Sequence, residues 1–184
     1  MSKIFATSDL HLGHNRDFVW EKRGFHNVDE MNRALIKNWN EIVNEDDDVY
    51  LLGDVMLGNN EVGINLLKQL NGHLHIIIGN HDTSSRIALY KSCMNVLEVE
   101  AAKYLKYGKY TFFLTHYPCL TGNGEKHLSE CIINLYGHTH QTTPYFEGNP
   151  QLYNVGVDAH HCAPVLIDDI IEDLKVRFQN FKNI

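Results

Sequence analysis

The chain has 184 residues, of which 43% are hydrophobic and 21% are charged, so we expect a single domain over residues 1–184 with a substantial core. No run of about 18 apolar residues occurs, which excludes a membrane-spanning helix, and the first residues lack a signal-peptide pattern, so we expect a cytoplasmic protein. The formal net charge of -7 argues against extended nucleic-acid binding, whereas a nucleotide substrate stays open because bound metal ions would reverse the local charge.

The first half of the chain alternates short apolar runs with stretches of helical periodicity. The expected strands are 4–8, 49–52 and 73–78, and the expected helices are 27–42, 60–70 and 84–92. Asn27 can cap the first of these helices, with Glu30 completing a capping-box pattern. Apolar residues then recur at helical spacing, at Met31, Leu35, Trp39 and Ile42. A polar loop is expected between the first strand and this helix, from Asp9 to about Asn27.

The second half of the chain consists mostly of expected strands. These are 96–105, 110–115, 132–136, 142–146, 152–155 and 165–167. Tyr107-Gly108-Lys109 indicates a hairpin turn, and a closing helix is expected from about Asp168. Alternating strands and helices followed by a run of strands predict two packed sheets with helices outside them.

Five short polar clusters follow the expected strands. They are Asp9-Leu10-His11, Gly53-Asp54, Gly79-Asn80-His81-Asp82, Thr115-His116 and Gly137-His138-Thr139-His140. Asp9 and His11 are two residues apart, so an extended backbone would point both side chains to the same side. Carboxylates combined with imidazoles suit divalent Mn, Fe, Zn, Co or Ni. Because sites collect at the carboxyl ends of parallel strands, the clusters predict a metal site there.

Each cluster also has an ordinary structural interpretation. Asp-x-His and Gly-Asp are common in turns, Asn80 could cap a helix, and His116 could be a hydrogen-bonded core histidine. Five separate structural explanations, each placed directly after a strand, are harder to accept than one shared metal site.

The ordered set of clusters resembles the motif of the calcineurin-like metallophosphoesterase superfamily. That motif reads Asp-x-His, Gly-Asp, Gly-Asn-His-Asp/Glu, a lone His and then Gly-His-x-His, and all five parts are present in order from residue 9 to residue 140. The amino-acid sequences of 8–14 and of Asn154-Val155-Gly156-Val157-Asp158 are similar to those of a branch of small bacterial and phage phosphoesterases.

The resemblance implies a four-layer αββα sandwich, in which two mixed β-sheets are flanked by helices, with two metal ions at the strand ends. It further implies the metal ligands by position. Metal one would take Asp9, His11 and His140; metal two would take Asn80, His116 and His138; Asp54 would bridge both. His81 would be a catalytic histidine that binds no metal, and Asp82 would orient its ring. Manganese is the first choice of metal, with iron, zinc, nickel and cobalt as alternatives.

This ligand set has a clear chemical use. Two metal ions about 3.5–4 Å apart can clamp the attacking and leaving oxygens of an in-line displacement and lower the pKa of a shared water, so that hydroxide is available. A positioned imidazole such as His81 can protonate the leaving oxygen. We therefore expect hydrolysis of a small phosphate ester, with a phosphodiesterase favoured over a phosphomonoesterase.

Three further residues in the loop after the first cluster are candidates for substrate binding: His14, Arg16 and Arg23. Either arginine could bind phosphate through its fork of N–H donors. The alternative function is a binding scaffold that keeps the fold without catalysis. The retained ligands and His81 argue against that alternative, and the oligomeric state stays open.

Overall fold

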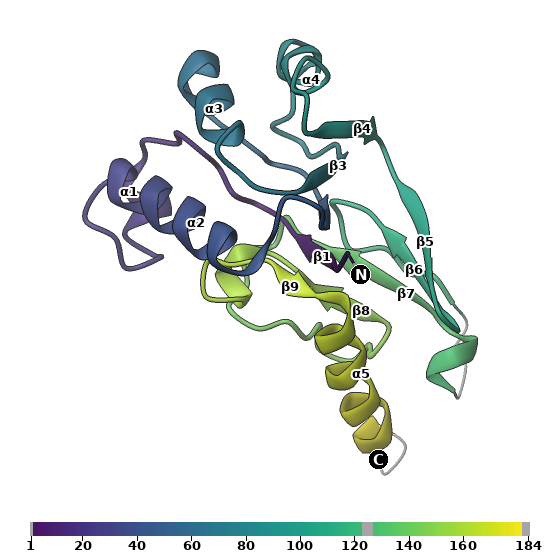
Figure 1. The fold of residues 1–184 in the computed structure, drawn as a ribbon. Coiled ribbons are helices and arrows are strands. Elements are labelled where there is room, and N and C mark those ends of the chain that lie inside the picture. The colour runs from purple at the N-terminus through teal and green to yellow at the C-terminus, as the bar shows by residue number, and fades with distance from the viewer. Residues whose placement is uncertain (1, 123–126, 182–184) are drawn as a thin grey trace.

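The computed structural model describes residues 2–122 and 127–181, whose strands form two mixed sheets (Figure 1). The first sheet has the order β4-β3-β2-β1-β9. Its strands are β1 (Ile4–Thr7), β2 (Asp48–Leu51), β3 (His73–Ile77), β4 (Val96–Glu100) and β9 (Val165–Leu166). The strands β1 to β4 are parallel and β9 is antiparallel, so the carboxyl ends of four strands lie at one edge.

The second sheet has the order β5-β6-β7-β8. Its strands are β5 (Lys103–Tyr107), β6 (Tyr110–Leu114), β7 (Ile132–Tyr136) and β8 (Leu152–Asn154). The strands β5 and β6 form the expected hairpin, since Tyr107 pairs with Tyr110 across a two-residue turn. The strands β6, β7 and β8 are parallel, so their carboxyl ends also share an edge.

The helices take positions that the sequence largely predicts. They are α1 (Asp17–Trp20), α2 (Val28–Ile42), α3 (Asn60–Leu67), α4 (Ser84–Tyr90) and α5 (Ile167–Phe181), with short 3-10 turns η1 (Leu128–Glu130) and η2 (Val157–Ala159). The Asn27 side chain accepts a hydrogen bond from the Glu30 N–H at 2.9 Å, as expected of an N-cap. Within the described residues, no helix combines the length and apolar character needed to cross a bilayer.

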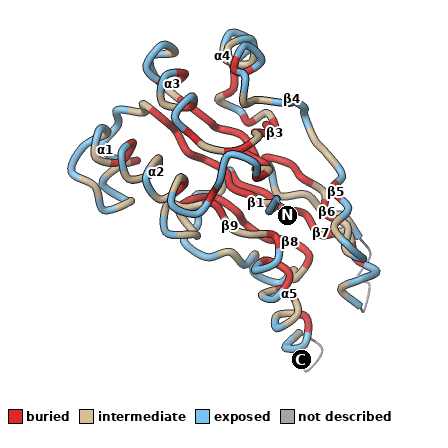
Figure 2. The backbone as a smooth tube through the Cα atoms, in the orientation of Figure 1, coloured by how far each residue is buried: buried red, intermediate tan, exposed pale blue. Residues whose placement is uncertain are grey.

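Two apolar cores separate the layers. The first lies between one face of the first sheet and helices α1 to α4, and contains Met31, Leu35 and Trp39 from α2. The second lies between the two sheets and also takes in α5 through Ile170 and Leu174. In the sheet between these cores, the central strands β1, β2 and β3 are mostly buried, whereas the edge strands β4 and β9 are more exposed (Figure 2). This arrangement confirms the expected class of two mixed sheets flanked by helices.

Three expected elements are corrected by the structure. The run 96–105 is not one strand, because the chain leaves the first sheet after Glu100 and enters the second at Lys103. The expected strand 142–146 is absent; only an isolated bridge joins Tyr145 to Tyr153, and Pro144 within this run has no N–H to donate to a ladder. The expected loop 9–27 contains the four-residue helix α1.

Candidate metal centre

The five polar clusters meet at the carboxyl ends of strands from both sheets. Backbone hydrogen bonds join their loops: the Asp9 N–H donates to Gly53 O at 3.1 Å, and the Gly137 N–H donates to His116 O at 3.0 Å. The His138 N–H donates to Asp9 Oδ2 at 2.8 Å, which links the first and last clusters across the sandwich. Side chains as far apart in sequence as Asp9 and His140 therefore face one small volume.

The first group of candidate ligands contains Asp9, His11 and His140, which lie close enough together to hold a metal ion. The Nε2 atoms of His11 and His140 lie 3.2 Å apart. Asp9 Oδ1 lies 4.0 Å from His11 Nε2 and 3.9 Å from His140 Nε2. One carboxylate oxygen and two imidazole nitrogens thus converge, which is a suitable donor set for a divalent transition metal.

The second group contains Asn80, His116 and His138. Asn80 Oδ1 lies 2.9 Å from His116 Nε2 and 2.9 Å from His138 Nδ1. The other ring nitrogen of His116, Nδ1, donates to Leu52 O at 2.8 Å. In a neutral His116 ring, Nε2 therefore has a lone pair and no hydrogen, and this lone pair faces the Asn80 oxygen. Two electron-pair donors that face each other in this way are expected where both bind the same cation.

Asp54 lies between the two groups. Its Oδ2 atom is 3.6 Å from His11 Nε2 and 3.6 Å from His116 Nε2, so one oxygen faces a ligand from each group. Its other oxygen, Oδ1, accepts a hydrogen bond from the His81 N–H at 2.9 Å. The orientation of the carboxylate is therefore held by the backbone of the neighbouring cluster.

The electrostatics of the first group also fit a cation. Asp9 is buried, and its Oδ1 atom has no hydrogen-bond partner among the described residues. Burial raises the pKa of Asp9 and lowers the pKa of His11 to about 2. The His11 ring is therefore uncharged near neutral pH and has a nitrogen lone pair available for a metal ion. A buried carboxylate oxygen without a hydrogen-bond donor is costly, and a bound divalent ion would offset that cost.

Backbone strain is concentrated at the candidate ligands. Seven non-glycine residues in the described part of the chain have positive φ, and five of them are Asp9, His11, Asp54, His138 and His140. L-residues rarely adopt this conformation, and it persists only where the surrounding structure enforces it, typically at functional sites. The strain therefore supports a functional purpose for these five positions independently of their chemistry.

Close packing explains the glycines that begin two of the clusters. A Cβ atom on Gly79 would overlap Asp54 Oδ1, and one on Gly137 would overlap Ser8 Oγ and Asp9 Oδ2. Neither glycine has a positive φ, so space rather than backbone freedom requires them. The glycines let the loops approach closely enough to bring the ligands together.

Asp158, in η2, is a supporting residue that the sequence reasoning did not single out. Its Oδ2 atom accepts a hydrogen bond from His140 Nδ1 at 2.8 Å, which leaves His140 Nε2 facing the centre. This bond raises the pKa of His140. Burial alone would raise the pKa of Asp158, but hydrogen bonds from His140 and Arg23 outweigh it and hold that pKa below its usual value. The signal was present in the Asn-Val-Gly-Val-Asp stretch that carried the family resemblance.

Arg23 does not have the position expected of a phosphate-binding residue. Its side chain is 2% exposed, and its guanidinium donates to both oxygens of Asp158, at 2.9 Å and 3.1 Å. The remaining N–H groups donate to the carbonyl oxygens of Leu10 and Asp9 and to the Met31 sulfur. Because all five donors are occupied, the expectation for Arg23 is wrong, and the residue braces the first cluster instead.

The other two residues expected to bind substrate remain accessible. Arg16 is exposed and its guanidinium makes no hydrogen bond within the described part of the chain. The His14 ring lies 5.4 Å from the His11 ring, and burial lowers the pKa of His14. His14 therefore borders the centre, whereas Arg16 faces solvent.

His81 and Asp82 lie in the same cluster but have different surroundings. The His81 side chain is 44% exposed, and its Nε2 atom lies 3.9 Å from Asp54 Oδ2, at the rim of the centre. Asp82 is buried, and its carboxylate accepts hydrogen bonds from the N–H groups of Gly79, Asp54 and Val55 and from the Tyr90 hydroxyl. The expectation that Asp82 orients the His81 ring is therefore corrected: it holds the loops that carry Asp54 and Asn80.

Replacing Asp82 by alanine is expected to destabilise the protein by about 3 kcal/mol or more, because three buried N–H groups would lose their acceptor. Tyr90→Phe removes only one of the four donors and should cost about 1 kcal/mol. Urea unfolding at a fixed metal concentration measures both. Equal stability of Asp82→Ala and the unmodified protein would contradict the bracing role.

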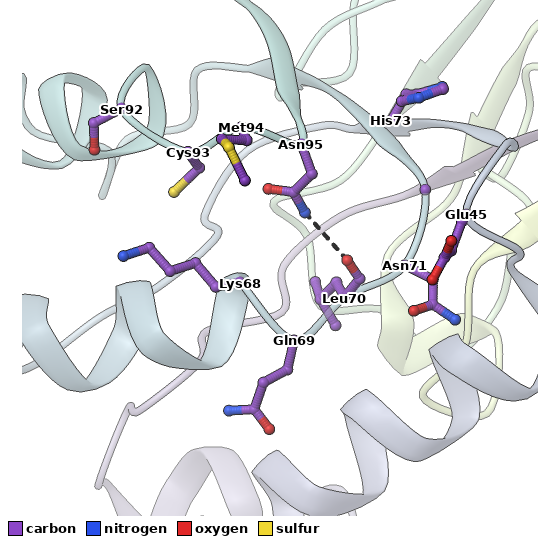
Figure 3. Close-up of a pocket in the computed structure, with 11 residues that line it drawn as sticks. Glu45, Lys68, Gln69, Leu70, Asn71, His73, Ser92, Cys93, Met94 and Asn95 are labelled. Atoms are coloured by element: carbon purple, nitrogen blue, oxygen red, sulfur yellow. Dashed lines mark hydrogen bonds between the residues drawn. The ribbon is translucent and has the colours of Figure 1, made fainter.

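A hollow of about 720 Å³ lies away from these residues. It is lined by residues around the end of α3 and the starts of β3 and β4, including Lys68, His73 and Asn95 (Figure 3). The starts of parallel strands are at the opposite edge of the sheet from their carboxyl ends. The hollow contains none of the predicted site residues, so it is separate from the candidate metal centre.

The part of the chain that carries every candidate ligand matches a known protein family. The sequence pattern of the calcineurin-like phosphoesterase superfamily domain matches residues 2–160. The chain belongs to the calcineurin-like phosphoesterase superfamily. It is therefore a metal-dependent phosphoric ester hydrolase that uses divalent ions and acts on a small phosphate ester, and the family expected from the five clusters is confirmed.

Relatives of this calcineurin-like phosphoesterase occur in archaea and in phages. An uncharacterized protein of Methanocaldococcus jannaschii is 34% identical over 176 residues, covering 94% of this chain and 91% of the relative. The gene 66 protein of Mycobacterium phage D29 is 30% identical, covering 95% of this chain and 100% of the relative. A solved structure from Aquifex aeolicus, of a protein of unknown function, matches 94% of this chain and 99% of its own with a TM-score of 0.70. At 19% identity that similarity supports the fold alone.

Proposed function

We propose that this phosphoesterase binds two divalent metal ions and hydrolyses a phosphodiester in preference to a phosphomonoester. Metal one takes Asp9, His11 and His140, and metal two takes Asn80, His116 and His138. Asp54 bridges them. The observation that best supports two ions is the equal distance of 3.6 Å from Asp54 Oδ2 to a histidine of each group.

The residues of the chain have distinct tasks in this proposal. When bound, the metal ions supply an activated water and neutralise charge on the phosphoryl oxygens. The hydrogen bond from the His81 N–H fixes the orientation of the Asp54 carboxylate, so that it faces both ligand groups. The exposed His81 ring is placed to hold a proton on Nε2 and deliver it to the leaving oxygen.

The hydrogen bonds that occupy Arg23 favour a diester substrate over a monoester substrate. A monoester dianion carries one more negative charge than a diester and is commonly clamped by an arginine fork. Here the arginine next to the first cluster is committed to Asp158 and to backbone carbonyls. A diester monoanion needs less charge neutralisation, so it suits this centre better.

The proposal also treats residues 1–184 as one catalytic domain. The family pattern ends at residue 160, but Ile170 and Leu174 of α5 are fully buried in the core between the two sheets. Removing α5 would expose that core, so the C-terminal helix belongs to the folding unit.

The function is tested by counting metals and screening esters. Purified protein is loaded with Mn, Ni, Zn, Co or Mg in turn, its metal content is measured by elemental analysis, and turnover is compared on bis(p-nitrophenyl) phosphate and p-nitrophenyl phosphate. We expect two ions per chain, the highest kcat/KM with Mn, and preference for the diester. Saturation at one ion would overturn the dinuclear proposal, and preference for the monoester would overturn the substrate assignment.

Asp158→Asn is expected to weaken binding of the first metal by about 10- to 100-fold, the usual effect of losing a partner that orients a ligating histidine. The amide keeps the size of the side chain but removes the charge that pairs with Arg23 and His140. Calorimetric titration of the metal-free protein measures the change. Asp46→Asn, at an exposed residue of the loop before β2, is the matched control and should bind metal normally.

A further inference from the structure

A second hollow, of about 390 Å³, adjoins the candidate metal centre. Its lining includes Phe18 of α1, Lys22, Arg23, His140 and Thr142. Val19 and Asp158 also line it. Its volume falls within the range of about 300–1,000 Å³ that is usual for small-molecule sites.

The hollow shares His140 with the centre, and its lining residue Phe18 contacts a second histidine, His14, beside the centre. His140 belongs to both, because its Nε2 atom faces His11 while its Nδ1 atom donates to Asp158. The ring of Phe18 stands edge-on to His14 at 5.8 Å, and the His14 ring is 5.4 Å from that of His11. A substituent on a phosphate held at the centre would therefore lie next to residues that line or contact the hollow.

The lining favours a flat apolar group. Three polar residues of the lining are already engaged, because Arg23 and His140 both donate to Asp158 and so offer few free hydrogen bonds. Lys22 is the charged lining residue outside this network. Phe18 is 58% exposed, whereas its neighbour Val19 is buried. A large apolar side chain left exposed next to a polar site is a common feature of ligand-binding surfaces.

We propose that this hollow binds an aromatic ring carried by one ester arm of the substrate, stacked against Phe18, with a nucleobase as the biological form of such a ring. The inference rests on the proposed phosphodiesterase function and adds a substrate class to it. Lys22 and Thr142, both exposed at the walls, can hydrogen-bond polar edges of the ring.

The test compares inhibition constants of monoesters against metal-loaded protein, with methyl p-nitrophenyl phosphate as the assay substrate. Phenyl phosphate is paired with methyl phosphate, and adenosine 5′-monophosphate with ribose 5-phosphate. Stacking of a base on an aromatic side chain corresponds to roughly a 5- to 150-fold gain in affinity. We expect the ring-bearing member of each pair to bind tighter by such a factor, and Phe18→Ala to abolish the difference without changing the constants for methyl phosphate and ribose 5-phosphate.

Two further variants make the result specific. Phe18→Tyr keeps a ring and should keep the gain. Tyr104→Ala removes a similarly exposed aromatic residue, 61% accessible, from the edge strand β5 of the second sheet. This variant should also keep the tighter binding of the ring-bearing inhibitors. Thermal unfolding and metal content of Phe18→Ala should match those of the unmodified protein, because Phe18 is not a core residue.

The outcomes separate this inference from the function on which it rests. Equal inhibition by both members of each pair, or a gain that survives Phe18→Ala, would overturn the aromatic subsite while metal-dependent turnover of the assay substrate still supports the phosphodiesterase. Absence of that turnover in the unmodified, metal-loaded protein would instead count against the proposed function itself.

Discussion

Replacing Asp54 by asparagine is expected to release both metal ions and to reduce diester turnover more than the loss of any single terminal ligand. The hydrogen bond from the His81 N–H to Asp54 Oδ1 explains why. An asparagine would keep its one oxygen on that N–H and so place its NH2 group where Oδ2 now lies, 3.6 Å from His11 and from His116. An NH2 group carries hydrogens where a metal ligand needs a lone pair.

The loss of turnover should exceed the roughly 100-fold effect that is usual when only an outer partner of a ligand is removed. Metal content after dialysis against a defined Mn concentration, together with turnover, measures the effect. His138→Ala is the comparison, since it removes a ligand of metal two alone and should leave one ion bound. An Asp54→Asn protein that retains two ions and near-normal turnover would show that Asp54 does not bridge.

His81→Ala is expected to keep the fold and both metal ions but to lose roughly 10²- to 10⁴-fold in turnover. That factor corresponds to about 3–5 kcal/mol of activation free energy. The ring is 44% exposed, so its removal leaves no core cavity. The backbone N–H that orients Asp54 is also unchanged by this substitution. The effect should therefore fall on the chemical step and not on metal binding.

The size of the loss should depend on the leaving group. A nitrophenolate leaves as a stable anion and needs little protonation, so its ester should be affected less than an alkyl ester with a basic leaving oxygen. Turnover of both ester types and metal content are measured side by side in His81→Ala and His116→Ala, of which only the second should lose a metal. Loss of a metal in His81→Ala would make His81 a ligand, and equal loss on both esters would exclude the role of leaving-group acid.

Much of the fold could be predicted because its signals are local. The boundaries of β7 and the start of α2 follow from an apolar run and from the Asn27 cap, which depend on neighbouring residues only. The division of 96–105 into β4 and β5 could not be predicted in this way. Both halves alternate like strands, and only pairing with β3 or with β6 assigns each half to its sheet.

The candidate site also combines features that local sequence predicts with features that only tertiary packing decides. By itself, the sequence determined the strand-end clusters, because their residue types and spacing are properties of short segments. The family resemblance that these clusters carry then supplied the candidate ligands, among them Asp9, His11, Asp54 and His140. Tertiary structure alone decided that Arg23 pairs with Asp158, 135 residues away, and that Asp82 accepts from the Asp54 N–H across 28 residues. A charged side chain in a loop can face solvent, substrate or another loop, and its hydrogen-bond partners exist only once the sheets have packed and water has been excluded.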